Sequence, residues 1–397
     1  MSGASEIYPT LIRNAAVVTP DGIIPQGYAL INEQGRLASV GTMEGQGSLP
    51  SVERSVDACG GWLLPGFIDV HVHGGFGHDF MDAGAAELDA ITRFHAAHGT
   101  TTMLATTVTA SQAAISGVLS RVSAYRQQVM PFATLAGVHL EGPFISPQWP
   151  GAQNPNFIEP PRKDWLEAWH TQYPGLIRML TLAPERDGAP ELIEWLTRSG
   201  IVASCGHTDA SYEQLTAARK HGLRHAVHTF NAMTGLHHRK PGVVGAVLDH
   251  DDVSAEIIAD GHHVHPAAIR LLTRVKRQDN LLLITDAISA AGLGDGEYSL
   301  GGLDVMVKDG VARLRDGDNL AGSTLTMLGA LRFMVEKVGI DLAAASRMAS
   351  WNPAKLLGLA QTTGSIEAGK QADLLQLTPA LELERVWIRG REPQLGL

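Results

Sequence analysis

Apolar and amphipathic segments alternate through the central part of the chain, and this alternation restricts the fold more than any other feature. Eight short apolar segments have the length and composition of buried strands, and most gaps between them carry apolar residues at helical spacing. Alternating strands and helices imply a parallel sheet, and eight such repeats predict an α/β protein with a TIM-like (β/α)8 barrel. The predicted strands are 63–72, 100–108, 135–140, 177–182, 201–205, 224–228, 253–259 and 281–285. The predicted helices are 85–98, 113–127, 164–172, 191–199, 212–221 and 266–277.

The two ends of the chain carry a different pattern. Residues 7–60 alternate short apolar runs with turns that contain glycine, and residues 372–377 and 386–388 repeat this pattern. We therefore expect a small β-sandwich domain built from both termini, residues 1–62 and 363–397, beside a catalytic barrel of residues 63–362. Hairpin-like pieces interrupt the barrel pattern at 294–322, and further helices are expected at 324–338 and 342–349.

Charge and cysteine usage exclude several classes of protein. The formal net charge of -10 argues against nucleic acid or an anionic membrane as the main partner, although a local basic cluster can still bind a phosphorylated molecule. The two cysteines, Cys59 and Cys205, stand far apart and form no Cys-x-x-Cys pattern, which fits a reducing compartment. The first residues lack a basic region followed by an apolar core, and no apolar run reaches membrane-spanning length. The expected location is the cytoplasm.

Side chains suited to metal binding lie where five of the predicted strands end. They are His71 and His73 after the first strand, Glu141 after the third, His207 after the fifth, His228 after the sixth and Asp286 after the eighth. The carboxyl ends of parallel barrel strands meet at one mouth, where active sites lie. Imidazole and carboxylate ligands without thiolate indicate zinc, iron or manganese. Each residue alone also fits a hydrogen-bonded group of the core, so the argument rests on their coincidence.

Such a site suggests hydrolysis. A bound metal lowers the pKa of a water ligand and polarises a substrate carbonyl. Asp286, beside the metal, can take the water's proton and later return it to a leaving amine.

Several motifs resemble those of the amidohydrolase superfamily, and within it those of the enzymes that deacetylate N-acetylglucosamine 6-phosphate. The resemblance runs through nearly the whole chain. The motifs are PGFID at 65–69 with His71-x-His73, HLEGP at 139–143, GH at 206–207, HTFNAM at 228–233, IADGHH at 258–263, TDA at 285–287 and AGS at 321–323.

The resemblance implies a ligand set and a catalytic group. It implies Glu141, His207 and His228 as ligands of the principal divalent metal, with zinc as the first expectation and iron or manganese as alternatives. Because His71 and His73 are present, a second ion bridged by Glu141 and completed by Asp286 is expected to be compatible with the site, which gives one or two ions per subunit. It also implies Asp286 as the catalytic acid and base.

The same resemblance implies the residues that contact the substrate, an amino sugar phosphate. They are Ala152, Gln153, Asn231, Ala232, Arg239, Asp260, Gly261, His262, His263, Leu320, Ala321 and Gly322. Arg239 lies in the most cationic short run of the chain, His237-His238-Arg239-Lys240, and its planar fork suits phosphate oxygens. The resemblance further implies a homodimer in which Arg239 reaches the neighbouring subunit's active site; a solvated surface run is the alternative.

One departure concerns the segment Gly151-Ala152-Gln153-Asn154-Pro155, where the family usually has a histidine in place of Gln153. A glutamine can donate a neutral hydrogen bond but cannot carry positive charge or relay a proton. The change fits either a tolerated replacement or an altered N-acyl sugar.

The expected function is metal-dependent hydrolysis of N-acetylglucosamine 6-phosphate to glucosamine 6-phosphate and acetate, with a metal-held hydroxide attacking the acetyl carbonyl. One alternative is deacetylation of N-acetylgalactosamine 6-phosphate or of another N-acyl amino compound. A second is a non-catalytic barrel that binds a sugar phosphate. Asp286 argues against the second alternative, because binding alone has no use for a proton acceptor.

Overall fold

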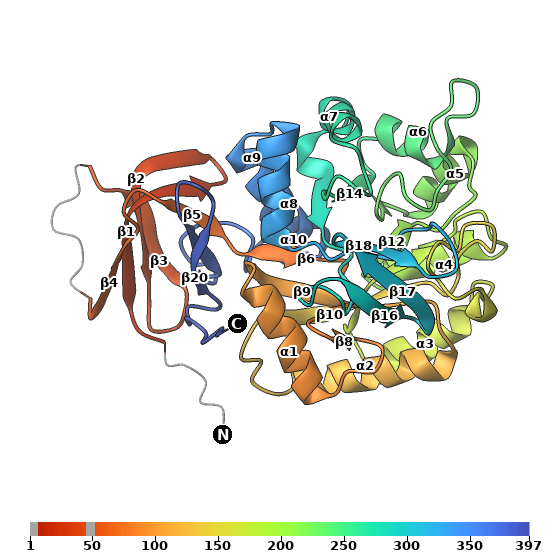
Figure 1. The fold of residues 1–397 in the computed structure, drawn as a ribbon, viewed down its shortest axis with the longest axis horizontal. Coiled ribbons are helices and arrows are strands. Elements are labelled where there is room, and N and C mark those ends of the chain that lie inside the picture. The colour runs from red at the N-terminus through yellow and green to blue at the C-terminus, as the bar shows by residue number, and fades with distance from the viewer. Residues whose placement is uncertain (1–6, 45–51, 397) are drawn as a thin grey trace.

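The computed structural model describes residues 7–44 and 52–396, in which a barrel stands beside a separate small sheet (Figure 1). The barrel sheet has eight strands in chain order, and every pairing between neighbours is parallel. The strands are β6 (Phe67–Asp69), β9 (Thr100–Thr107), β10 (Thr134–Glu141), β11 (Ile177–Leu182), β12 (Val202–Cys205), β13 (His225–Ala226), β14 (Ser254–Ile258) and β15 (Leu281–Ile284). The predicted (β/α)8 architecture is confirmed.

The barrel strands can be predicted from the sequence because most of their residues are buried. Every residue of β9 and of β14 is buried, and β9 achieves this with five threonines. β-branched threonine favours extended backbone, and its hydroxyl can satisfy backbone groups inside the barrel. The hydroxyl of Thr106, for example, accepts a hydrogen bond from the backbone N–H of Val72 (2.9 Å).

Helices surround these strands (Figure 1). They are α1 (Ala85–Ala96), α2 (Gln112–Arg126), α3 (Lys163–Gln172), α4 (Ala189–Arg198), α5 (Tyr212–His221), α6 (Gly242–Asp249) and α7 (Pro266–Val275), with short 3-10 turns η1 (Pro155–Phe157) and η2 (Gln278–Asn280). The sequence did not predict α6, because its residues are apolar almost throughout and six of its eight are buried, so no polar face marks a helical period.

Local signals set the ends of α5, where prediction and structure agree. The hydroxyl of Ser211 accepts from the N–H of Gln214 (3.2 Å), and the Gln214 side chain accepts from the N–H of Ser211 (2.8 Å). This reciprocal pair is a capping box. The helix ends at Gly222, whose φ of 118° is accessible to glycine but costly for other residues.

The prediction that residues 63–72 form one strand is wrong. The segment contains two strands in different sheets: β5 (Trp62–Pro65) pairs with strands of the small sheet, and β6 begins the barrel. Gly66 separates them, and a Cβ atom there would lie 2.2 Å from the Thr101 hydroxyl. His71 and His73 therefore lie beyond the end of β6 rather than on a strand, and a short hairpin of β7 (Gly74–Gly75) and β8 (His78–Asp79) follows them.

The barrel closes through the segments that follow its first and last strands. The carboxylate of Asp69 accepts from the hydroxyl of Thr285 (2.5 Å) and from the N–H of His71 (3.2 Å). Beyond it, the N–H of Asp286 donates to the carbonyl of His71 (2.9 Å), and the N–H of His73 donates to the carbonyl of Ala287 (2.8 Å). The two ligand-bearing loops are thus joined directly.

Burial raises the pKa of Asp69 to about 7, although hydrogen bonds from Thr285 and His71 oppose this shift.

The ends of the chain form a separate β domain, as predicted. Its strands are β1 (Thr10–Thr19), β2 (Gly22–Ile31), β3 (Leu37–Thr42), β4 (Arg54–Asp57), β5, β19 (Leu374–Leu377) and β20 (Leu383–Trp387). The sequence suggested a small β-sandwich; the strands hydrogen-bond in one seven-stranded sheet, because β1 pairs with β2 on one side and with β4 and β5 on the other. Residues such as Ile12, Leu63 and Trp387 fill its own core. The boundaries at 62 and 363 stay predictions, and residues 1–6, 45–51 and 397 lie outside the described residues.

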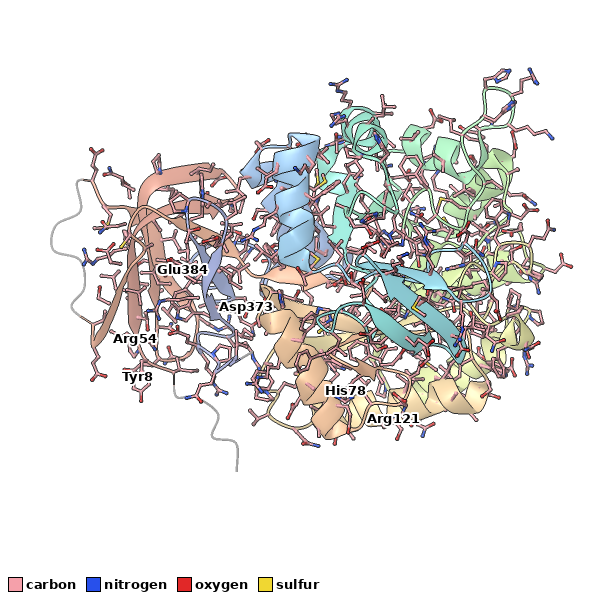
Figure 2. All side chains as sticks on the ribbon, viewed as in Figure 1. Tyr8, Arg54, His78, Arg121, Asp373 and Glu384 are labelled. Atoms are coloured by element: carbon pink, nitrogen blue, oxygen red, sulfur yellow. The ribbon has the colours of Figure 1, made fainter. Side chains whose placement is uncertain are left out.

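Buried polar contacts join this domain to the barrel. The carbonyl of Asp373 accepts from the N–H of Gly66 (2.8 Å), and its carboxylate accepts from the hydroxyl of Thr363 and the N–H of Arg389 (2.7 Å each). Asp373 lies on the barrel side of the small sheet, whereas Arg54, which pairs with Glu392, lies farther from the barrel (Figure 2). The strand pair β5–β19 is therefore fixed where the chain enters the barrel.

The expected hairpin region forms a three-stranded antiparallel sheet, with β16 (Gly296–Leu300), β17 (Leu303–Lys308) and β18 (Val311–Leu314). Helical segments follow as α8 (Met327–Phe333), η3 (Met334–Val338), α9 (Leu342–Ser346), η4 (Arg347–Trp351) and α10 (Asn352–Leu356). The last of them, α10, follows η4 directly and runs beyond the predicted end at 349. Among the described residues, no helix combines the length and the apolar character needed to cross a membrane.

Candidate active site

The predicted ligand residues meet at the carboxyl ends of the barrel strands. Glu141 ends β10, and its Oε1 lies 3.1 Å from His207 Nε2, 3.0 Å from His228 Nε2 and 3.3 Å from His71 Nε2. These side chains are almost fully buried. Residues separated by up to 157 positions in the sequence thus place their polar atoms within hydrogen-bonding distance of a single carboxylate oxygen.

Asp286 and His73 extend the cluster on the other side of Glu141. His73 Nε2 lies 3.1 Å from Asp286 Oδ1 and 3.3 Å from Glu141 Oε2, and His71 Nε2 lies 3.6 Å from Asp286 Oδ1. Two overlapping groups have ligand atoms close enough to share a cation: His71 with His73 and Asp286, and His71 with Glu141 and His228. The two groups have His71 in common, and Glu141 also lies close to the first group, because its Oε2 is 3.3 Å from His73 Nε2.

The backbone turns sharply at three of these positions. His207, His228 and Asp286 have φ values of 47°, 26° and 51°. Non-glycine residues pay about 1–3 kcal/mol for such conformations, which persist where the surrounding structure enforces them and which cluster at functional sites. Here they direct each side chain inward immediately past the end of its strand.

The hydrogen bonds of the outer ring nitrogens indicate what the inner nitrogens can bind. Nδ1 of His207 faces the carbonyl of Trp149 (3.1 Å), and Nδ1 of His228 faces the carbonyl of Asn231 (3.2 Å), so both Nδ1 atoms carry hydrogen. In the neutral rings the two Nε2 lone pairs then point at each other, 3.2 Å apart, and at the carboxylate of Glu141. Lone pairs and an anion repel one another unless positive charge lies between them. Although the buried Nε2 of His71 lies 3.3 Å from Glu141 Oε1, it makes no hydrogen bond of suitable geometry among the described residues. This donor set fits a divalent metal.

The electrostatics of the group formed by His71, His73 and Asp286 also favour a bound cation. Burial opposes a charge on His73, but hydrogen bonds and charges from Asp286 and Glu141 outweigh it and raise its pKa to about 9. Burial likewise opposes the charge on Asp286, yet His71 and His73 lower its pKa below the ordinary value. The carboxylates thus attract positive charge into the cluster.

Sequence reasoning missed a buried acid behind the ligands, Glu256 on β14. Its Oε2 accepts from Nδ1 of His71 (2.9 Å) and from the N–H of His228 (3.1 Å), and its Oε1 pairs with Nε2 of His225 (2.9 Å). Burial opposes its charge, but His71 and His225 lower its pKa well below the usual range. Such a carboxylate fixes the tautomer of a ligand histidine. The signal available in the sequence was a single acidic residue within the short, mostly apolar segment Ser254–Ile258.

A cavity of about 420 Å³ opens beside the cluster. Seven of the predicted substrate contacts line it: Ala152, Gln153, Asn231, Ala232, His263, Leu320 and Gly322. Sequence reasoning did not identify Trp149, Leu300, Asp318 or Asn319, which also line it. Leu300 ends β16, and Asp318 and Asn319 follow β18, so the inserted sheet supplies part of the wall.

The other five predicted contacts do not line this cavity. Asp260 instead holds His263: its Oδ2 lies 2.7 Å from His263 Nδ1, and its Oδ1 accepts from the N–H groups of His262 and His263. Gly261 provides the turn at φ 81°, and the His262 side chain is exposed. Ala321 is buried under the loop. Arg239 is exposed on the loop before α6, where it contacts His238 (2.7 Å).

Comparison with known proteins agrees with this geometry. The sequence profile of the amidohydrolase family matches residues 62–392. An N-acetylglucosamine-6-phosphate deacetylase of Bacillus subtilis (strain 168) is 40% identical over 384 residues, which are 96% of each chain. An N-acetylgalactosamine-6-phosphate deacetylase of Escherichia coli O157:H7 is 41% identical over 329 residues, 83% of this chain and 87% of its own.

A solved structure extends the likeness to three dimensions. The D267A mutant of N-acetyl-D-glucosamine-6-phosphate deacetylase from Mycobacterium smegmatis, in complex with N-acetyl-D-glucosamine-6-phosphate, has a TM-score of 0.89 and 36% identity, and the match covers 97% of this chain and 99% of that one. The profile match and the relatives show that the chain belongs to the amidohydrolase family.

Proposed function

We propose that this protein is a metal-dependent deacetylase that hydrolyses N-acetylglucosamine 6-phosphate to glucosamine 6-phosphate and acetate. The observation that carries the proposal is the carboxylate of Asp286, which lies beside the Glu141–histidine cluster and lines the cavity of about 420 Å³. The relatives that share most of the chain's length support the choice of substrate.

In this proposal Glu141, His207 and His228 hold the principal ion, and His71, His73 and Asp286 hold a second ion when one is present. Zinc is the first expectation for this donor set, with iron and manganese as alternatives. A divalent ion at this position would polarise the substrate carbonyl and make a water molecule more acidic.

The residues of the chain carry the proton transfers. Asp286 is ionised, so Oδ1 can accept a proton from the attacking water and then deliver it to the amide nitrogen as the C–N bond breaks. His263, whose Nδ1 is held by Asp260, presents its ring in the cavity wall, where Asn231 also offers an amide to sugar hydroxyls.

Removal of metal tests the reaction class. Dialysis against a strong chelator is expected to lower acetate release from N-acetylglucosamine 6-phosphate by at least roughly 100-fold, because the ion's contribution to charge stabilisation is several kcal/mol. Readdition of zinc, iron(II) or manganese should restore the rate, and metal analysis of the active forms would identify the ion and its number per subunit. An enzyme freed of metal that keeps its full rate would exclude the proposal.

We also propose a homodimer in which Arg239 reaches the partner's cavity. The loop that carries Arg239 also exposes Leu236, and Leu271 and Val275 on α7 are more than half exposed. Leu236 and Val275 line one shallow depression with Tyr212 and Leu248. An exposed apolar area of this kind is typical of a protein–protein interface, and an arginine at its edge suits a phosphate.

Replacing Arg239 with alanine is therefore expected to raise KM for the 6-phosphate roughly 10–100-fold, as expected for loss of a charge-assisted bidentate contact of about 1.5–3 kcal/mol. KM for unphosphorylated N-acetylglucosamine should change little. The matched control is Arg198→Ala on α4, an exposed arginine outside this loop. Equal KM values for the parent and Arg239→Ala on the phosphorylated sugar would contradict the assignment.

The relative from Escherichia coli O157:H7 keeps N-acetylgalactosamine 6-phosphate as an alternative substrate. Comparison of kcat/KM on the two epimeric sugar phosphates decides between them. Binding of either sugar without acetate release would instead favour a non-catalytic barrel. We propose a cytoplasmic location, which the two free cysteines Cys59 and Cys205 support.

A further inference from the structure

Gln153 is held at both ends of its side-chain amide. Its Nε2 donates to Glu141 Oε2 (2.5 Å), and its Oε1 accepts from the backbone N–H of Thr109 (2.6 Å). The residue is 5% exposed. Because a carboxylate can only accept and an N–H can only donate, the amide orientation is determined by its partners.

The two oxygens of Glu141 have different surroundings. Oε1 faces the ring nitrogens of His71, His207 and His228, whereas Oε2 faces His73 (3.3 Å) and the amide of Gln153. The hydrogen bond to Oε2 therefore restricts rotation of the carboxylate about its Cγ–Cδ bond. Without it, only contacts from the ligand histidines would orient this group.

The anchor for Gln153 is itself rigid. Thr109 follows β9, and Gly142 follows Glu141; a Cβ atom on Gly142 would lie 2.2 Å from the Thr109 hydroxyl. The ends of β9 and β10 are thus in close contact, and Gln153 connects Thr109 on one to Glu141 on the other.

We propose that Gln153 is a positioning residue for the metal centre, which holds the Glu141 carboxylate so that Oε1 faces the three histidines and Oε2 faces His73. This inference rests on the metal centre of the proposed function. It also explains why an amide rather than a charged side chain stands at this position. A glutamate would bring a second carboxylate oxygen to Glu141 Oε2. A protonated histidine would compete with the ion for that oxygen.

Metal affinity, measured by competition with a chromophoric chelator, tests the assignment. Gln153→Met has a similar volume but neither hydrogen bond, and we expect its zinc affinity to fall roughly 10–100-fold, the usual consequence of losing a hydrogen bond to a ligand. Gln153→Asn keeps the amide but is one methylene too short to span both partners, so its affinity should be intermediate. The control is Gln148→Met, since Gln148 lines the same cavity but its side chain makes no hydrogen bond among the described residues.

Three results separate the outcomes. The inference would be supported if the parent binds zinc, both Gln153 variants bind zinc more weakly, and Gln148→Met keeps the parent's affinity. Gln153→Met and Gln153→Asn with affinities within about twofold of the parent would overturn it while leaving the metal centre intact. A parent that binds no metal would overturn the metal centre itself. If Gln153→Met fails to fold, as judged by circular dichroism of the metal-free protein, Gln153→Asn decides the question.

Discussion

Replacement of Asp286 with asparagine is expected to lower kcat for acetate release roughly 10²–10⁴-fold, the range that positioned general acid–base groups contribute. Asparagine has nearly the same shape but cannot accept a proton. His71 and His73 keep the pKa of Asp286 low despite its burial, so the carboxylate is ready to accept a proton. The measurement is steady-state kinetics together with metal analysis, and the variant should retain the ion bound by Glu141, His207 and His228.

The control for this substitution is Asp318→Asn, which also neutralises a carboxylate in the cavity wall but lies outside the ligand cluster. Its kcat should stay within about tenfold of the parent, whatever happens to KM, because it takes part in no proton transfer in the proposed reaction. If Asp286→Asn turned over as fast as the parent, the proton would have to pass through another group.

Replacement of Glu256 with alanine is expected to destabilise the protein by roughly 3–5 kcal/mol, the usual result of removing one partner from a buried ion pair. Three buried donors, on His71, His225 and the backbone of His228, would lose their acceptor. Differential scanning calorimetry should show a lower midpoint of thermal unfolding for the metal-free variant than for the metal-free parent. Metal analysis should also show weaker retention at the site that includes His71, because Glu256 fixes the ring's tautomer.

An exposed pair of the same chemical type provides the comparison. Glu194 and His221 interact at 2.7 Å on the surface, where Glu194→Ala should change stability by less than about 1 kcal/mol. If Glu194→Ala and Glu256→Ala lowered the midpoint of thermal unfolding equally, burial of the contacts made by Glu256 would add nothing to stability.

The sequence predicted the ligand cluster because strand ends in a parallel barrel converge. Once Glu141, His207, His228 and Asp286 were assigned to strand ends, their proximity followed from the architecture. Glu256 was not predicted because it lies in the middle of β14, and its partner His71, which follows β6, is 185 positions away in the sequence. Only the tertiary structure brings such partners together.

Other errors have local physical causes. The stretch 63–68 has no polar side chain, so nothing in its pattern reveals that Gly66 divides it between two sheets. The short helix α6 lacks a polar face. Asp318 and Asn319 reach the cavity from the inserted sheet of β16–β18, whose position over the barrel depends on packing of residues such as Leu300 against Val108 and Ile288.

The contact between Asp69 and Thr285 joins residues 216 positions apart. An incomplete chain that ends before β15 therefore has no means of bringing His71 and His73 beside Asp286. During synthesis the cluster can form only after the last strand has emerged and docked. A cation shared by these two loops would bind the closed barrel more tightly than any opened form, so the ion expected to serve catalysis should also raise the free energy of unfolding of the barrel.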